Sequence, residues 1–89
     1  MGIAGIKIKI MPSSPNVNIG TIKTKAQDIV KTNGGRNRDY EIEPIAFGLK
    51  AVIAFFEWPE EKELESLEEQ LKAIENVNSI QVIDMRKIA

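Results

Sequence analysis

The sequence contains no histidine and no cysteine, and both absences narrow the range of functions. Without cysteine, the chain cannot form a disulfide framework or a thiolate metal site. Without histidine, it lacks the commonest metal ligand and the commonest general base. Metal-assisted hydrolysis and nucleophilic catalysis through a Ser–His or Cys–His pair therefore lack their usual residues. We expect a binding protein rather than an enzyme, with no metal and no cofactor.

Long apolar runs are missing as well. No apolar segment approaches the roughly 20 residues that are needed to cross a bilayer. The first residues do not show a basic segment followed by an apolar stretch of the signal-peptide kind. We therefore expect a cytoplasmic protein that does not bind membranes. The chain has 89 residues, enough for one small core, so we predict a single domain over residues 1–89.

The net charge of −1 conceals an uneven distribution of charge along the chain. Residues 57–75 carry eight acids against two lysines, whereas residues 1–56 carry eight bases against four acids. Residues 57–75 thus have a net charge of −6, and residues 1–56 have a net charge of +4. Such asymmetry favours a partner bound in one orientation over general affinity for nucleic acid.

Apolar spacing predicts the first half of the chain. Isoleucine and lysine alternate strictly over residues 6–10, which is typical of a strand with one buried face. Asn18 is placed to cap a helix that follows. The stripe that predicts this helix consists of Ile19, Ile22, Ala26, Ile29 and Val30.

The second half is predicted in the same way. We expect strands over residues 38–46, 49–57 and 79–87. The predicted core residues of the last strand are Ile80, Val82 and Ile83, with a bulge where the apolar alternation slips. Between the last two strands, Trp58 and Pro59 are predicted to open a helix, because proline is favoured in the first helical turn. The apolar face of that helix consists of Leu64, Leu67, Leu71 and Ile74.

The predicted order of elements is β-α-β-β-α-β. Hairpin pairing and right-handed crossovers then favour an α+β, ferredoxin-like two-layer sandwich with an antiparallel sheet in the order 4-1-3-2. Residues 51–56 are all apolar, which fits a central strand covered on both faces. Pro44 cannot donate a backbone hydrogen bond, which fits an edge strand.

This topology separates the most distinctive side chains. Phe47 falls in the turn between the second and third strands, while Lys87 ends the fourth strand at the opposite end, roughly 25 Å away. Phe47 either projects from the turn or folds back over its own core, and the sequence leaves both open. We expect a positive surface at the end opposite Phe47. The residues that can form it are Arg36, Arg38, Arg86 and Lys87.

The segment Glu43-Pro44-Ile45-Ala46-Phe47-Gly48-Leu49-Lys50 resembles a known motif. It is similar to the Pro-Ile-x-Phe-Gly-x-Lys core of archaeal translation elongation factor 1-beta, the family of guanine nucleotide exchange factors for the GTPase elongation factor 1-alpha. Two further segments support the resemblance: Met11-Pro12-x-Ser14-Pro15 and Asp84-Met85-Arg86-Lys87-Ile88. Together these segments place the resemblance over nearly the whole chain.

The resemblance implies a function and a role for individual residues. The chain would promote the exchange of GDP for GTP on elongation factor 1-alpha without covalent chemistry, by disturbing the magnesium and nucleotide site of that GTPase. It implies that Lys87 is the catalytic residue and that Phe47 docks on the partner. The implied partner is GDP-bound elongation factor 1-alpha, with no nucleic acid and a monomer when free. The remaining implied partner-binding residues are Pro44, Ile45, Gly48, Lys50, Met85 and Arg86.

An RNA-binding module of ferredoxin-like topology is the alternative. Such modules carry a K/R-G-F/Y-G/A-F-V-x-F/Y pattern on the third strand. Residues 49–56 read Leu-Lys-Ala-Val-Ile-Ala-Phe-Phe and lack this pattern. An acylphosphatase-like enzyme would need a phosphate-binding loop with an arginine after the first strand, and residues 11–16 do not contain one.

Overall fold

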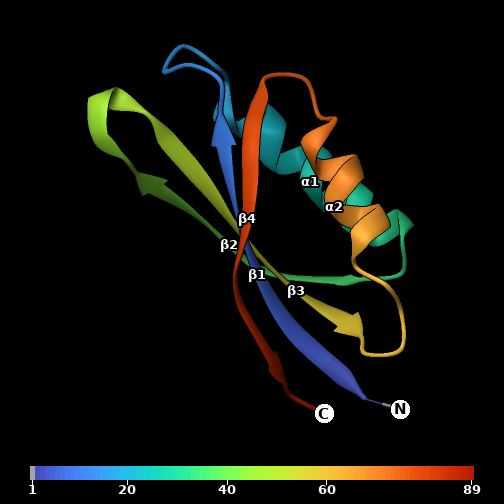
Figure 1. Cartoon of the computed structure of the whole chain (residues 1–89). Coiled ribbons are helices and arrows are strands. Elements are labelled where there is room, and N and C mark those ends of the chain that lie inside the picture. Colours follow the sequence, from blue (N-terminus) through green and yellow to red (C-terminus); the bar gives the residue numbers. More distant parts are fainter. Residues whose placement is uncertain (1) are drawn as a thin grey trace.

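The computed structural model describes residues 2–89 and has the predicted βαββαβ order (Figure 1). Both helices cover one face of a four-stranded sheet, and the other face is open. This arrangement confirms the ferredoxin-like two-layer sandwich. The elements are β1 (Ile3–Pro12), α1 (Ile19–Thr32), β2 (Arg36–Pro44), the short 3-10 helix η1 (Ala46–Gly48), β3 (Lys50–Pro59), α2 (Glu65–Lys72) and β4 (Val77–Lys87).

The strands lie in the order β2-β3-β1-β4, and every neighbouring pair is antiparallel. This is the predicted order 4-1-3-2 read from the other edge. The apolar strand β3 is central, and β2 with Pro44 lies at an edge, as predicted. Pro44 pairs with Lys50 at the last step before the turn, where the missing N–H costs the sheet little.

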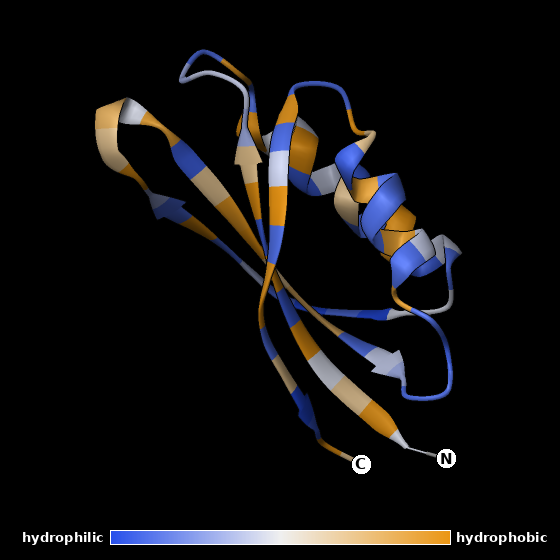
Figure 2. Cartoon of the chain, in the orientation of Figure 1, coloured by the Kyte–Doolittle hydropathy of each residue, from blue (hydrophilic) through white to orange (hydrophobic). Residues whose placement is uncertain are grey.

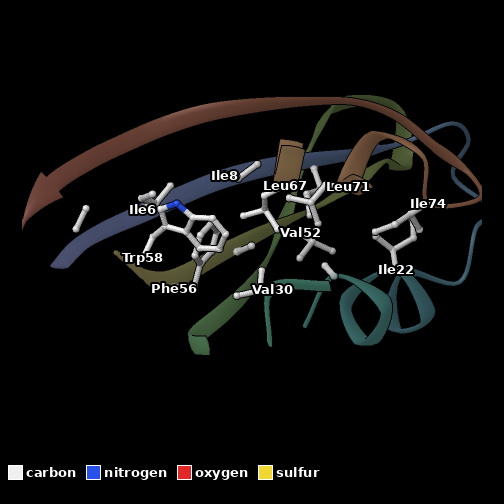
Figure 3. Close-up of a cluster of buried hydrophobic side chains, with 14 residues drawn as sticks. Ile6, Ile8, Ile22, Val30, Val52, Phe56, Trp58, Leu67, Leu71 and Ile74 are labelled. Atoms are coloured by element: carbon white, nitrogen blue, oxygen red, sulfur yellow. The ribbon is translucent and has the colours of Figure 1, made fainter. Parts of the chain in front are cut away.

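The core lies between the sheet and the helices, as Figure 3 shows. Ile6, Ile8 and Ile10 of β1 point toward the helices and are fully buried, which the alternation predicted. The two helices contribute their apolar stripes, chiefly Ile22 and Leu71. Burying each of these side chains contributes about 1.5–3 kcal/mol to folding. Outside this layer the helices are polar, as the hydropathy colouring in Figure 2 shows.

Helix α1 begins where the sequence predicted. The Asn18 side chain accepts a hydrogen bond from the Thr21 backbone N–H at 3.3 Å and caps the helix. Ile22, Ala26 and Val30 form its buried face. This cap and this stripe together hold a helix whose glycine and threonines are poor helix formers.

The prediction that Trp58 and Pro59 open the second helix is wrong. Strand β3 continues to Pro59, and α2 begins only at Glu65. Trp58 packs edge-on against Phe56 with ring centroids 6.0 Å apart, and its indole N–H donates to the Lys62 carbonyl at 3.0 Å. These interactions keep Trp58 in the sheet and hold residues 60–64 as a loop. As a consequence, the last rows of the sheet extend beyond the helices (Figure 1).

The other strands also differ at their ends from the predicted ranges. Strand β2 begins two residues earlier than predicted because Arg36 pairs with Glu57 on the longer β3, and it ends at Pro44 because the 3-10 turn follows. Strand β4 begins at Val77 and contains the predicted bulge, where the register with β1 shifts. The bulge places Ile83 on the open face, 45% exposed, so its predicted core position is wrong.

Candidate functional site

The connection between β2 and β3 presents Phe47 to solvent. Phe47 has φ 63° and ψ 30°, and its side chain is 93% exposed. A bulky side chain in this left-handed region costs about 1–3 kcal/mol, so the surrounding turn must impose the conformation. The alternative that Phe47 folds back over its own core is therefore wrong.

Backbone hydrogen bonds close the turn around Phe47. The Ile45 N–H donates to the Leu49 carbonyl at 2.7 Å, and the Leu49 N–H donates to the Ala46 carbonyl at 3.3 Å. Gly48 follows with φ 77°, a value that glycine adopts at little cost. The loop after β1 lies close by, since a side chain at Gly48 would meet Pro15 at 3.8 Å. We call residues 44–50 the hairpin tip; it contains five of the predicted partner-binding residues, Pro44, Ile45, Phe47, Gly48 and Lys50.

The other predicted residues lie at the end of β4. Lys87 is opposite Ala4 of β1, and Ala4 is in turn opposite Trp58 of β3. The residues after Lys87 are held in place: the Ile88 N–H donates to the Ile3 carbonyl at 2.9 Å, and the Ile3 N–H donates to the Ala89 carbonyl at 2.9 Å. The backbone of Lys87 is thus fixed on both sides, while its side chain is 69% exposed.

A hollow of about 340 Å³ lies beside Lys87, on the sheet rows that α2 does not cover. Met85, which is 56% exposed, and Arg86 also contribute to its walls. We call this hollow the terminal groove. Its lining consists of Ala4, Ile6, Trp58, Glu60, Lys62, Leu64, Met85, Arg86 and Lys87.

Three of the four predicted cations at this end have carboxylate partners. Arg38 contacts Glu57, Arg86 lies 3.0 Å from the Asp84 carboxylate, and the Lys87 ammonium lies 3.8 Å from the Glu60 carboxylate. The topology brings the four predicted basic residues to one end, as expected. They do not form a purely positive surface, because the acids alternate with them.

The structure therefore divides the predicted residues into two groups, the hairpin tip and the end of β4. Lys50 is the last residue of the tip, and Trp58 lies in the row of Lys87, so eight residue steps along β3 span about 26 Å between them. The molecule is 42 Å long. Because β1 and β3 pair from Ile3 opposite Pro59 to Ile10 opposite Val52, the two groups are held apart by one sheet.

Sequence reasoning missed Glu60 and the terminal groove. Both depend on Trp58 staying in the sheet, whereas Trp58 and Pro59 together matched a helix start. The signal that could have identified the longer strand is the alternation of apolar residues at Val52, Ala54, Phe56 and Trp58, all of which are buried.

The open face of the sheet bears on the RNA-binding alternative. On β3, Phe55 is the one aromatic residue on the open face. The Lys7 ammonium lies 5.5 Å and the Arg38 guanidinium 5.8 Å from the centroid of its ring. Acids stand in the neighbouring positions, including Glu41 opposite Ile53 and Asp84 opposite Lys7. A phosphate backbone is attracted by uncompensated cations, and this face offers few.

Three further findings concern the described part of the chain. Between residues 2 and 89, no group of three Asp or Glu side chains is placed to hold a metal ion. Neither helix in this range has the length and apolarity that a membrane span requires. Burial raises the pKa of Tyr40 on β2, so this phenol stays protonated and donates to the Asn37 side chain at 2.6 Å.

Residues 5–88 match the family model described as the EF-1 guanine nucleotide exchange domain, and the chain belongs to this family. It is thus an elongation-factor domain with an exchange function, which confirms the family that the sequence resembled.

Archaeal relatives match over nearly their whole length. The chain is 39% identical to elongation factor 1-beta of Methanococcus aeolicus over 87 residues, which cover 96% of this chain and 97% of that protein. It is 36% identical to elongation factor 1-beta of Methanosarcina barkeri over 89 residues, covering 99% and 100%.

Solved structures share the fold at low identity. The C-terminal domain of MgtC from Mycobacterium tuberculosis superimposes with a TM-score of 0.75 at 11% identity, covering 98% of this chain and 89% of that chain. The ACT domain of GTP pyrophosphokinase from Chlorobium tepidum gives a TM-score of 0.64 at 11% identity, covering 89% and 96%. These two likenesses support the fold alone.

Proposed function

We propose that this protein accelerates the exchange of GDP for GTP on elongation factor 1-alpha by contacting that GTPase at two separate places. The observation that carries the proposal is the exposed Phe47 at one end of a rigid sheet and the exposed Lys87 at the other. An exposed aromatic ring on a closed turn suits a partner pocket, because burial of such a ring gives much of the binding energy at interfaces. The tip would then hold the partner while the other end acts on its nucleotide site.

Lys87 can act as a mobile positive charge. Its ammonium is a compact cation on a four-carbon stem, so it can reach ground beside a phosphate that a hydrated Mg²⁺ would occupy. If Lys87 displaces that ion, the β-phosphate of GDP loses its main counter-charge and the nucleotide leaves faster. A 1000-fold acceleration requires about 4 kcal/mol of preferential stabilisation of the leaving state.

Such a mechanism makes and breaks no covalent bond, and it needs neither histidine nor cysteine. The ammonium would enter the partner in the GDP-bound state, which therefore is the state that this protein binds. The proposal further includes a monomer when free, action in the cytoplasm where translation takes place, and no direct contact with nucleic acid. The balanced charges of the open sheet face support this last point.

Release of a fluorescent guanine nucleotide from the cognate GTPase tests the proposal. We expect stopped-flow traces to show release that becomes faster and then saturates as this protein is added, and that remains fast when unlabelled GTP replaces GDP as the competitor. A catalytic amount of the protein should suffice, since it is not consumed. Release at the same rate with and without the protein would overturn the proposed function.

A further inference from the structure

The Lys87 side chain lies opposite a carboxylate to which neither the sequence motif nor the proposed function gives a role. Glu60, the first residue after β3, places a carboxylate oxygen 3.8 Å from the Lys87 ammonium. The two residues lie at the ends of the strands on either side of β1: Lys87 ends β4 and pairs with Ala4, and Glu60 follows Pro59 of β3, which pairs with Ile3.

The loop that carries Glu60 is held by hydrogen bonds. The Glu60 N–H donates to the Gly2 carbonyl at 2.9 Å, the Lys62 N–H donates to the Pro59 carbonyl at 3.1 Å, and the Trp58 indole donates to the Lys62 carbonyl at 3.0 Å. Trp58 itself is buried. The backbone of Glu60 is therefore anchored to both β1 and the core.

Gly2 leaves the space that the carboxylate occupies. A methyl group built at Gly2 would overlap the Glu60 side chain, so any larger residue there would push the carboxylate aside. The absence of a side chain at Gly2, just before β1, leaves the Glu60 carboxylate room to lie toward Lys87. The ion pair thus depends on one residue from each of three neighbouring strands or their ends.

We propose that Glu60 is a positioning residue for Lys87, an inference that rests on the proposed function of Lys87. A lysine stem has many rotamers, and an ammonium that must enter a site on a partner is more effective when fewer of them are populated. A carboxylate on an anchored loop restricts the ammonium to the mouth of the terminal groove. Because both groups are exposed, the pair is weak, and the ammonium can leave it when the partner binds.

A double-mutant cycle tests this role. Glu60→Gln should lower the maximal rate of nucleotide release at saturating protein by about two- to fivefold, the range of an exposed ion pair, with little change in the half-saturating concentration. Glu61→Gln is the matched control, since Glu61 is a neighbouring exposed acid with no ion pair among the described residues, and it should leave the maximal rate unchanged. In a Lys87→Ala background, Glu60→Gln should have no further effect.

A second measurement does not depend on exchange. NMR relaxation of the Lys87 side chain in the free protein should show greater mobility in Glu60→Gln than in the wild type or in Glu61→Gln. Unchanged mobility would overturn the positioning role. The role would also be overturned if Glu60→Gln raised the maximal rate of release, or if it lowered that rate by the same factor in the Lys87→Ala background as in the wild type. If Lys87→Ala itself leaves release unchanged, the proposed function fails, and the mobility measurement alone decides whether Glu60 restrains Lys87.

Discussion

The two ends of the sheet present their distinctive side chains in different ways. At the hairpin tip, a short turn fixes Phe47 through its own backbone, with a positive φ and two closing hydrogen bonds. At the other end, Lys87 stands on paired strands and has a fixed backbone, but its side chain is free to move except for one loose ion pair. The tip therefore offers a rigid apolar contact, and the end of β4 offers a movable charge.

This difference suits a division of roles in which the hairpin tip binds the GTPase and Lys87 promotes release of its nucleotide. A rigid aromatic ring loses little conformational entropy when it is buried in a partner, so it contributes mainly to affinity. A long charged side chain loses more, and its charge has its effect only where it meets another charge at close range. If the two ends have these separate tasks, substitutions at them should change different kinetic constants.

The largest effect is expected for Lys87→Ala. Removing the ammonium should lower the maximal rate of nucleotide release by at least 100-fold, while the affinity for the GTPase changes by less than about 1 kcal/mol, because an exposed charge contributes little to binding. Stopped-flow release at saturating protein gives the rate, and calorimetry gives the affinity.

Lys25→Ala provides the control for this substitution. Lys25 is an exposed cation on α1, so its loss changes the net charge equally without touching either end of the sheet. We expect it to exchange nucleotide at the wild-type rate. A large loss of affinity in Lys87→Ala, with the maximal rate preserved, would reverse the roles assigned to the two ends.

Phe47→Ala should have the next largest effect and the opposite pattern. Loss of the ring should weaken binding by roughly 1–3 kcal/mol, if it is a buried anchor in the complex. The maximal rate at saturation should stay within about twofold of the wild type, because Lys87 is unchanged. Thermal unfolding should also be unchanged, since the ring is 93% exposed and supports no core.

Ile83→Ala removes a comparable exposed apolar group from the open face and should bind normally. A drop in thermal stability of several kcal/mol for Phe47→Ala, with affinity preserved, would mean that the ring packs on its own domain in solution.

The sequence predicted the fold because its strongest local patterns agree with the tertiary structure. The isoleucines of β1 and the apolar run of β3 leave few ways to build a sheet, and Pro44 indicates an edge. Trp58 and Pro59 show where such reasoning fails. The same two residues match a helix start and a strand end, and only the packing of Trp58 on Phe56 decides between them.

The candidate site was predictable in part for a similar reason. Strand direction places Phe47 and Lys87 at opposite ends, since β2 runs toward the hairpin tip while β3 and β4 both run away from it. Exposure of Phe47 and the pair between Lys87 and Glu60 were not predictable. The first depends on a positive φ within the turn, and the second depends on side chains from separate strands meeting across β1.

The smallest effect is expected for Gly48→Ala, which tests whether the turn itself orients the ring. An added methyl group would meet only Pro15, at an ordinary 3.8 Å, so the change acts through the backbone at φ 77°. The strain should lower the free energy of unfolding by about 1 kcal/mol, as measured by chemical denaturation.

A turn that relaxes to relieve this strain would tilt Phe47 and weaken binding, with the maximal rate again unchanged. Gly48→Asn is the matched variant, because asparagine tolerates a positive φ better than alanine and should keep more of the stability and affinity. If Gly48→Ala leaves both quantities at their wild-type values, the turn adapts without cost, and the contrast between a rigid tip and a movable lysine does not hold.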